Sequence, residues 1–379
     1  MKIAIPKEIR EYETRVAISP LVVTKLSGMG LDVVVEAGAG AGSAMTDAVL
    51  KDAGATIAAT AEATYDGAAM VLKVARPTDD EMAALPDGCT LIGLLAPLQH
   101  RDQVAAYAAK NVTAFAMELV PRISRAQSMD ALSSQRNLAG YKAVLDAANA
   151  FGKVLPMMMT AAGTIAPAKT LVLGAGVAGL QAIATAKRLG SVVSAFDVRP
   201  VVKEQVESLG AKFVEVASEE TESAETAGGY AKEMSDDYKR RQSELIHETL
   251  KTQDIAICTA LIPGRTAPTL ITAQMVADMK PGSVIVDLAT ETGGNCELSE
   301  YGKVVVKHGV NIVGHANVPG RVAVDASALY ARNLLNFLTP MIDVDTTAIK
   351  VDWDDEVFAG ACVTRDGQVV HPMLVDGDG

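Results

Sequence analysis

Short apolar runs alternate with segments of mixed polarity along the first third of the chain. These runs predict strands at residues 2–5, 33–36, 71–74, 90–95 and 112–117. The segment at residues 16–29 predicts a helix between the first two strands. Strands that alternate with helices are typical of a parallel sheet sandwiched by helices.

A long predicted helix at residues 131–151 separates this region from a second one. The second region is predicted to contain strands at residues 170–173, 191–196, 212–216, 255–259, 283–287 and 311–313. Because a chain of 379 residues is too long for one ordinary core, two domains are expected. We predict an α/β fold of two Rossmann-like doubly wound domains joined by a long bridging helix.

The tail completes the first domain in this prediction. A helix in the tail, which begins at residue 333, is expected to pack back on that domain, and residues 357–370 predict a hairpin that turns at Asp366-Gly367. Residues 1–130 and 325–379 would then form one composite domain. Residues 131–324 would form the nucleotide-binding domain, with a mobile loop near residues 220–240.

A glycine-rich turn follows the strand predicted at residues 170–173. It consists of Gly174, Ala175, Gly176, Val177, Ala178 and Gly179, and a helix-like segment comes after it. In a dinucleotide-binding unit the first glycine permits a tight turn, the second lets the backbone approach a pyrophosphate, and the third lets helix pack on strand. The amino end of the helix then faces the phosphates, so the turn predicts a dinucleotide site.

The residue after the next strand indicates which nucleotide is bound. Asp197 follows the strand predicted at residues 191–196. A carboxylate there accepts hydrogen bonds from the adenosine ribose and repels a 2′-phosphate, which favours NAD(H) over NADP(H). Arg199 is interpreted as a surface arginine rather than a ligand for a 2′-phosphate. The other glycine-rich run, at residues 38–43, has the wrong spacing and is predicted to be a structural loop.

Charge and cysteine content narrow the class of protein. The chain has 34 basic and 46 acidic residues, and its net charge of −12 argues against nucleic acid as a partner. Its 4 cysteines form no CxxC pair, so neither a metal site nor a disulfide framework is expected. No signal peptide is expected. The weakly charged region at residues 154–186 is predicted to be buried α/β core rather than a membrane-spanning helix.

A highly charged segment, residues 217–248, has two interpretations. It is either a solvated helix with a loop, or a lid in which Gly228 and Gly229 form a hinge that closes Tyr230 over the nucleotide. The sequence leaves both interpretations open.

Groups that position a nicotinamide are concentrated in residues 122–135. Two arginines, Gln127, Asp130 and several serines there can bind a carboxamide and a ribose. Among the histidines, His315 follows a predicted strand at the carboxyl edge of a sheet and is a candidate to line the site. A hydride that passes directly between two nicotinamides needs alignment and no proton carrier, so the lack of an evident catalytic base favours such a transfer.

Nine motifs point together to one family. They are residues 121–134, Asn137-Leu-Ala-Gly-Tyr141, Thr160-Ala-Ala-Gly163, residues 174–179, Phe196-Asp-Val-Arg-Pro200, Lys203-Glu-Gln205, Gly228-Gly-Tyr-Ala-Lys232, Thr259-Ala-Leu-Ile-Pro-Gly264 and Gly293-Gly-Asn-Cys296. With them the chain resembles, over nearly its whole length, the NAD(H)-binding component (alpha-1, domain I) of proton-translocating nicotinamide nucleotide transhydrogenase, in the alanine dehydrogenase/transhydrogenase superfamily.

The resemblance implies roles for individual residues. Arg122, Asp130 and Ser133 would hold the nicotinamide carboxamide, and Gln127 would reach the facing NADP(H). Besides the glycine-rich turn, the residues expected to contact NAD(H) are Asp197, Val198, Arg199, Gly229, Tyr230, Ala260 and Leu261.

The resemblance also implies an activity and an assembly. The activity would be that of an NAD(P)+ transhydrogenase (Si-specific/Re-specific, proton-translocating), with NAD(H) on this chain and NADP(H) only on a partner. The chain would form a homodimer and lie as a peripheral protein on the cytoplasmic face of the inner membrane. There it would dock on an NADP(H)-binding component and a membrane-spanning proton-channel component, which resembles the separate-subunit arrangement.

Two alternatives remain. Alanine dehydrogenase shares the superfamily, and Arg15 and Lys73 match the positions that bind a keto-acid carboxylate in it. Its catalytic histidine would lie in residues 90–98, where this chain has none, and Glu291 replaces the acid expected near Gly293. The second alternative is a non-catalytic NAD sensor, which would bind NADH and transfer no hydride.

Overall fold

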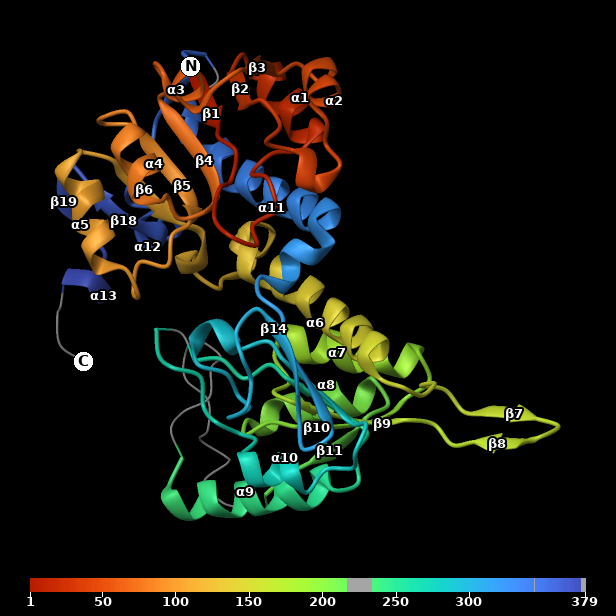
Figure 1. Cartoon of the computed structure of the whole chain (residues 1–379). Coiled ribbons are helices and arrows are strands. Elements are labelled where there is room, and N and C mark those ends of the chain that lie inside the picture. Colours follow the sequence, from red (N-terminus) through yellow and green to blue (C-terminus); the bar gives the residue numbers. More distant parts are fainter. Residues whose placement is uncertain (217–233, 263, 344, 376–379) are drawn as a thin grey trace. The chain divides into compact units, whose positions relative to one another are not determined.

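The computed structural model divides the chain into two compact units, which are described separately (Figure 1). The structure describes all residues except 217–233, 263, 344 and 376–379. Unit 1 comprises residues 1–135 and 320–379, and unit 2 comprises residues 136–319. The divisions thus fall at residues 135 and 319, where the sequence predicted 130 and 324.

Unit 1 is built on an eight-stranded sheet in the order β19-β18-β6-β5-β4-β1-β2-β3. The strands are β1 (Lys2–Ile5), β2 (Asp32–Glu36), β3 (Thr56–Ala58), β4 (Met70–Ala75), β5 (Thr90–Leu94), β6 (Thr113–Ala116), β18 (Cys362–Arg365) and β19 (Gln368–Val369). Neighbouring strands from β6 to β3 pair in parallel, whereas β18 pairs antiparallel with both β6 and β19. The predicted α/β class is confirmed for this unit.

Helices surround this sheet. They are α1 (Pro20–Gly28), α2 (Asp47–Asp52), α3 (Ala61–Tyr65), α4 (Asp79–Ala84), α5 (Arg101–Ala109), α11 (Ala323–Leu338), α12 (Glu356–Ala361) and α13 (Pro372–Val375), with a small separate hairpin of β16 (Ile342–Asp343) and β17 (Ala348–Ile349). Helix α1 begins later than predicted because Pro20 occupies its first turn, where a missing N–H costs nothing. The ring of Phe337 on α11 meets Phe115 and Phe358 edge-on, at centroid distances of 5.5 and 5.4 Å.

The predicted hairpin at residues 357–370 is partly wrong. Its first residues form α12, whose N-cap Asp355 accepts a hydrogen bond from the Val357 N–H. The antiparallel pair is limited to β18 and β19, with the turn at Asp366 and Gly367, both of which have positive φ. A positive φ at both central residues matches the twist of a two-residue hairpin, so the turn itself was placed correctly.

Unit 2 has a seven-stranded sheet in the order β11-β10-β9-β12-β13-β15-β14. Its strands are β9 (Lys169–Leu173), β10 (Val192–Phe196), β11 (Lys212–Val214), β12 (Ile255–Cys258), β13 (Val284–Asp287), β14 (Lys303–Lys307) and β15 (Val310–Gly314). All neighbours pair in parallel except β14 with β15. Without β14, the order is that of a dinucleotide-binding doubly wound sheet, in which the strand order reverses beside β9.

The helices of this region are α6 (Ala131–Ala150), α7 (Val177–Arg188), α8 (Lys203–Ser208), α9 (Asp236–Leu250) and α10 (Ala273–Ala277). The division between the units falls within α6, close to its start. Among the described residues, no helix is both long and apolar enough to cross a membrane.

The prediction that residues 154–186 form buried core is wrong for their first segment. Strands β7 (Met158–Thr160) and β8 (Gly163–Ile165) pair only with each other and form a hairpin that extends away from the sheet of unit 2 (Figure 1). Met158 and Met159 are 45% and 77% exposed. Apolar composition marks residues that can be buried, but only packing decides whether a partner surface is present. The later residues, in β9 and α7, lie in the core as predicted.

One glycine lets α6 approach α7 within unit 2. A Cβ added to Gly140 would lie 2.0 Å from the carbonyl oxygen of Ala178. Real Cβ atoms do not approach backbone oxygens this closely, so the helices must separate if Gly140 gains a side chain.

We expect Gly140→Ala to lower the free energy of unfolding by about 1–3 kcal/mol, because backbone must shift to relieve the overlap. Gly152→Ala is the matched control, since nothing lies within 4 Å of its added Cβ. Urea unfolding of both variants measures the effect. Equal midpoints for the two variants would contradict the packing argument.

Candidate dinucleotide site

The glycine-rich turn lies between β9 and α7, and each glycine meets a different constraint. Gly174 has a φ of +98°, and a Cβ there would lie 2.7 Å from the Thr259 hydroxyl oxygen. A Cβ on Gly179 would lie 1.8 Å from the carbonyl oxygen of Gly174. Around Gly176 nothing lies within 4 Å of an added Cβ. The first and third glycines therefore serve the turn and the packing, and the second leaves open space.

That open space adjoins the amino end of a helix. Gly176 is the N-cap of α7, and no side chain caps this helix end. The first N–H groups of a helix need an acceptor, and the helix dipole favours an anion beside them. This geometry fits a pyrophosphate and supports the residues predicted from 174 to 179.

Asp197 lies beside this turn because β10 pairs with β9 in register, Phe196 opposite Leu173. Its Oδ2 accepts hydrogen bonds from the Ala175 N–H at 2.7 Å and from Arg199 Nη2 at 2.8 Å. Its Oδ1 accepts from the backbone N–H and Nε of Arg199, both at 2.9 Å. The acid is thus oriented by the turn that it is expected to serve.

The interpretation of Arg199 as a plain surface residue is wrong. Its guanidinium is half-buried and forms an ion pair with Asp197, with a side-chain exposure of 14%. A cation there reduces the net negative charge beside the ribose position. Any preference for NAD(H) would therefore rest on the placement of the carboxylate acceptors more than on repulsion of a 2′-phosphate. Val198, between the two residues, packs against the core of unit 2.

The loop after β12 contacts the glycine-rich turn. The Thr259 N–H donates to the Leu173 carbonyl oxygen at 2.8 Å, and its hydroxyl donates to the Gly174 carbonyl oxygen at 2.9 Å. Ala260 and Leu261 follow directly and are half-buried. The sequence analysis missed Thr259 as a residue that supports the turn, although its position at the end of a predicted strand is the signal that marks such residues.

The residues predicted to hold the nicotinamide lie in unit 1. Asp130 precedes α6, and its two carboxylate oxygens accept from the Ser133 N–H at 2.9 Å and the Ser133 hydroxyl at 2.6 Å. Arg122 is exposed, and so is Gln127, in the 3-10 helix Ser124–Met129. Within this unit the structure brings Asp130 and Ser133 together. Arg125, in the same segment, is instead paired with Asp355.

Two other candidates have different outcomes. Gly229 and Tyr230, the predicted lid residues, lie outside the described residues, so both interpretations of that segment stay predictions. His315 is half-buried and directly follows β15, at the carboxyl edge of the sheet where the sequence analysis expected it.

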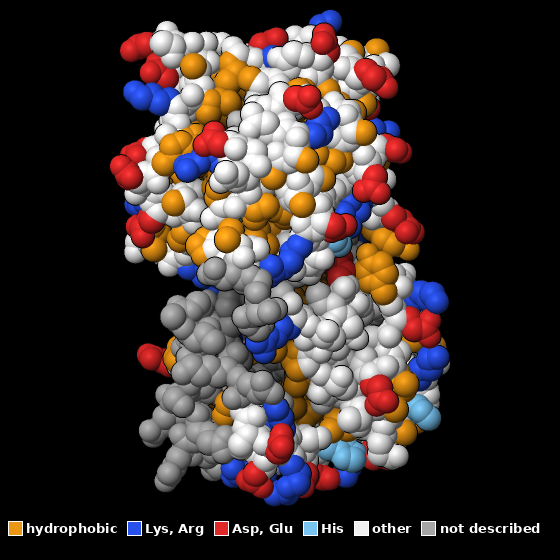
Figure 2. All heavy atoms as spheres, turned by 90° about the vertical axis from the view of Figure 1, so that its left-hand side faces the viewer, with side chains coloured by type: hydrophobic (Ala, Val, Ile, Leu, Met, Phe, Trp, Pro, Cys, Tyr) orange, Lys and Arg blue, Asp and Glu red, His pale blue; other side chains and the backbone are white. Residues whose placement is uncertain are grey.

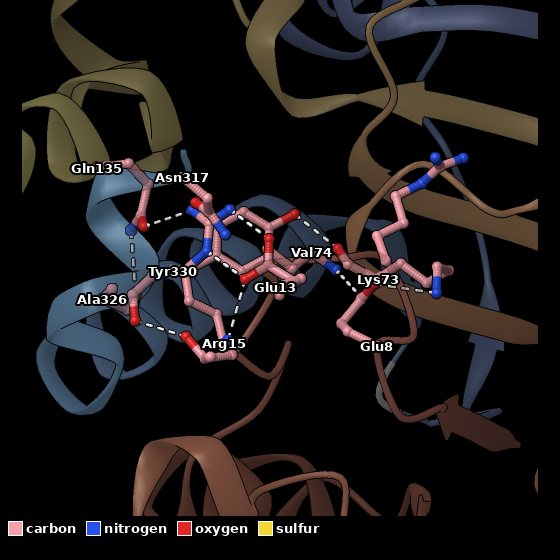
Figure 3. Close-up of polar contacts among 12 residues, drawn as sticks. Glu8, Glu13, Arg15, Lys73, Val74, Gln135, Asn317, Ala326 and Tyr330 are labelled. Atoms are coloured by element: carbon pink, nitrogen blue, oxygen red, sulfur yellow. Dashed lines mark hydrogen bonds and ion pairs between the residues drawn. The ribbon is translucent and has the colours of Figure 1, made fainter. Parts of the chain in front are cut away.

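Arg15 and Lys73 form buried ion pairs in unit 1 (Figure 3). Lys73 Nζ lies 3.1 Å from Glu8 and 2.5 Å from Glu81, and Lys73 is fully buried. Arg15 contacts Glu13 at 2.7 Å and donates to Gln135 Oε1 at 2.8 Å. Burial raises the pKa of Glu8, which the Lys73 ammonium opposes. Both cations thus already have carboxylate partners.

The end of β5, where alanine dehydrogenase is expected to carry a histidine, has a different polar group. Glu118 accepts hydrogen bonds from the N–H groups of Leu95 and Ala96, and Ala96 has a φ of +48°. Burial raises the pKa of Glu118 to about 7, although these backbone hydrogen bonds oppose the shift. Glu118 therefore holds a backbone turn at this position.

This shift predicts a pH-dependent stability. As the pH rises from 4.5, the ordinary pKa, to about 7, the unfolded chain releases the Glu118 proton before the folded chain does. The contribution of Glu118 to stability therefore falls over this range and levels off above it. We expect Glu118→Gln, which cannot ionise, to be less inferior to the unmodified protein at pH 8 than at pH 5 in denaturant unfolding. A stability difference that stays constant with pH would contradict the shift.

The surface of the chain is mixed. On the face drawn in Figure 2, acidic and basic side chains are interspersed, and hydrophobic side chains lie between them over unit 1. Among the described residues, no group of three or more His, Cys, Asp or Glu side chains could hold a metal ion.

Comparison with known proteins covers both units. Residues 4–139 match the family model "Alanine dehydrogenase/PNT, N-terminal domain", and residues 143–372 match "Alanine dehydrogenase/PNT, C-terminal domain". A Rhodospirillum rubrum protein, named as the first of the separate chains of NAD(P) transhydrogenase subunit alpha, is 60% identical over 99% of both chains. NAD(P) transhydrogenase subunit alpha of Haemophilus influenzae is 45% identical over 99% of this chain and 73% of its own length. An alanine dehydrogenase from Halomonas elongata is 30% identical over 100% of this chain and 97% of its own length.

Solved structures agree with the sequence comparison. The transhydrogenase from Sinorhizobium meliloti superposes with a TM-score of 0.88 at 50% identity and covers 98% of this chain and 100% of its own. An L-alanine dehydrogenase superposes with a TM-score of 0.82 at 26% identity and covers 99% of this chain and 98% of its own. The resemblance inferred from the sequence motifs is confirmed. The chain belongs to the alanine dehydrogenase/PNT family, and its relatives at 45–60% identity are NAD(P) transhydrogenase alpha subunits.

Proposed function

We propose that this chain is the NAD(H)-binding subunit of a proton-translocating NAD(P) transhydrogenase, Si-specific/Re-specific and active only with its partners. The observation that carries the proposal is the turn from β9 to α7, where open space at Gly176 and an uncapped helix end lie beside the oriented carboxylate of Asp197. Bound NAD(H) supplies the hydride chemistry. The residues of this chain bind and orient the nucleotide.

Each set of residues has a distinct task in this proposal. The backbone from 174 to 179 receives the pyrophosphate, and Asp197 accepts hydrogen bonds from the adenosine ribose. Val198, Arg199, Ala260 and Leu261 line the same region of unit 2. In unit 1, Arg122 and the Asp130–Ser133 pair bind the carboxamide. The pair is already connected by two hydrogen bonds, which fix the groups before the nucleotide arrives.

The partners follow from the same proposal. Gln127 is exposed and can face a second nucleotide, NADP(H), that is held by another subunit. A membrane-spanning proton-channel component completes the assembly, with this chain peripheral on the cytoplasmic face of the inner membrane. The exposed methionines of the β7–β8 hairpin support a homodimer, because a second copy would bury apolar surface that this chain leaves in solvent.

The alternative activity, amino-acid oxidation, is supported by one observation and opposed by two. Arg15 and Lys73 occupy the positions expected for carboxylate binding. However, both cations are paired with carboxylates inside unit 1. The loop after β5 also has Ala96, held by Glu118, and residues 90–98 have no histidine to carry a proton.

Reconstitution tests the proposal directly. The purified chain is mixed with an NADP(H)-binding transhydrogenase component, and transfer between NADH and NADP+ analogues is followed by absorbance. Transfer that requires both proteins is expected. A chain that binds NADH and supports no transfer would instead be a sensor.

We expect Asp197→Asn to weaken NADH binding by roughly 1.5–3 kcal/mol, or about tenfold to a hundredfold, because a charged acceptor is lost. Asp254→Asn is the matched control, since Asp254 precedes β12 at the opposite edge of the same sheet and accepts from the Lys169 N–H at 2.9 Å. Titration of nicotinamide fluorescence measures both variants. Equal affinities of the unmodified protein for NADH and NADPH would refute the role of Asp197.

We expect Gln127→Asn to slow hydride transfer in the reconstituted complex while NADH affinity stays near normal, because the shorter side chain disturbs alignment. Arg122→Ala should reduce both transfer and binding. Gln368→Asn, an exposed glutamine on the edge strand β19, is the control and should change neither. Transfer at the original rate by Gln127→Asn would remove this residue from the site.

We expect no turnover of pyruvate, ammonia and NADH by the purified chain. Positioned acid–base catalysis typically contributes about a hundredfold to ten-thousandfold, and the loop after β5 has no group to supply it. Robust reduction of NAD+ with alanine would overturn the proposed activity in favour of alanine dehydrogenase.

A further inference from the structure

Gly293, Gly294, Asn295 and Cys296 form a motif with no role in the function proposed above. The motif follows β13 in unit 2, and Asn295 is completely buried. Its side chain connects the motif to the loop after β12, which is the loop that carries Ala260 and Leu261.

The Asn295 amide satisfies both backbone polar groups of Ala260. Its Nδ2 donates to the Ala260 carbonyl oxygen at 2.9 Å, and its Oδ1 accepts from the Ala260 N–H at 3.0 Å. The same Nδ2 donates to the Pro268 carbonyl oxygen at 2.8 Å, further along that loop. One side chain thus replaces the strand partner that Ala260 lacks beyond the end of β12.

Asp287 in turn fixes Asn295. This carboxylate ends β13 and is 1% exposed. Its Oδ2 accepts from the N–H groups of Asn295 and Cys296 at 2.8 and 2.9 Å and from the Ser299 hydroxyl at 2.8 Å. Its Oδ1 accepts from the Ala289 N–H at 2.9 Å.

The two glycines make this arrangement sterically possible. Gly293 and Gly294 have φ values of +105° and +84°, which other residues rarely adopt. A Cβ on Gly294 would lie 3.0 Å from Asp287 Oδ2, within the space that the hydrogen bonds occupy. The glycines therefore direct two successive N–H groups onto one carboxylate.

We propose that Asn295, held by Asp287, is a positioning residue that presets the Ala260–Leu261 loop for the dinucleotide. This inference rests on the proposed function, because it takes Ala260 and Leu261 to contact NAD(H). Asn295 acts through the backbone of Ala260 and does not touch the nucleotide. Preset backbone loses less conformational freedom on binding, which strengthens affinity.

The test compares NADH affinity with fold stability in matched variants. Asn295→Ala leaves the N–H and carbonyl of Ala260 unpaired, and we expect NADH binding to weaken about tenfold at a temperature where the variant is folded. Ser191→Ala is the control. Ser191 is 3% exposed, donates to the Ala168 carbonyl oxygen at 2.8 Å and contacts Thr170 Oγ1 at 2.7 Å. It lies at the opposite edge of the sheet, so its loss should lower the melting temperature and leave NADH affinity unchanged.

A second variant gives a readout that a purely structural role would not produce. Asn295→Asp keeps an acceptor for the Ala260 N–H but turns an ionised oxygen toward two carbonyl oxygens. Protonation restores a donor, so the NADH affinity of this variant, measured on the folded protein, should recover between about pH 8 and about pH 6. The affinity of Asn295→Ala should show no such recovery.

A milder variant decides the question if neither substitution at residue 295 folds. Ser299→Ala removes one donor to Asp287 and should weaken NADH binding about twofold to threefold, about half the free-energy effect of a neutral hydrogen bond or less. Normal NADH affinity in folded Asn295→Ala, or in Ser299→Ala when the former does not fold, overturns the inference. Failure of the unmodified chain to bind NADH would instead overturn the proposed function.

Discussion

The close contact between Gly179 and the carbonyl oxygen of Gly174 is the constraint on which the candidate site depends. Because the third glycine has no side chain, α7 begins directly against the end of β9, and Gly176 is left beside open space at the helix end. Packing density and the anion-binding geometry thus have one cause. A methyl group at residue 179 would separate the helix from the strand and would also displace the N–H groups that are proposed to receive the pyrophosphate.

The carboxyl edge of the unit 2 sheet is supported from each neighbouring strand. Thr259 after β12 and Asp197 after β10 both hydrogen-bond to the glycine-rich turn, and Asp287 at the end of β13 organises the next loop. Parallel strands bring these residues to one edge although they are far apart in the sequence. The turn is therefore held by tertiary contacts on both sides, which gives it a defined conformation before a ligand binds.

Unit 1 buries charge where alanine dehydrogenase is expected to bind its substrate. Lys73 is fully buried between Glu8 and Glu81, and its removal would leave carboxylates in a poorly solvated interior. Breaking a buried pair typically costs about 3–5 kcal/mol. The integrity of unit 1 is thus reason enough to keep Lys73. The presence of Arg15 and Lys73 alone does not indicate amino-acid oxidation, and the loop held by Glu118 matters more for that distinction.

The sequence by itself determined the alternation of strands and helices, the glycine-rich turn with Asp197, and the family. These features follow from local periodicity and from residue types whose backbone or charge permits few alternatives. Tertiary structure decided the rest. The apolar residues of β7 and β8 are exposed because no other strand pairs with them, and Arg199 is half-buried because Asp197 is close enough to bind it. Likewise, Asn295 becomes a support for Ala260 only when β12 and β13 lie side by side, which no local pattern specifies.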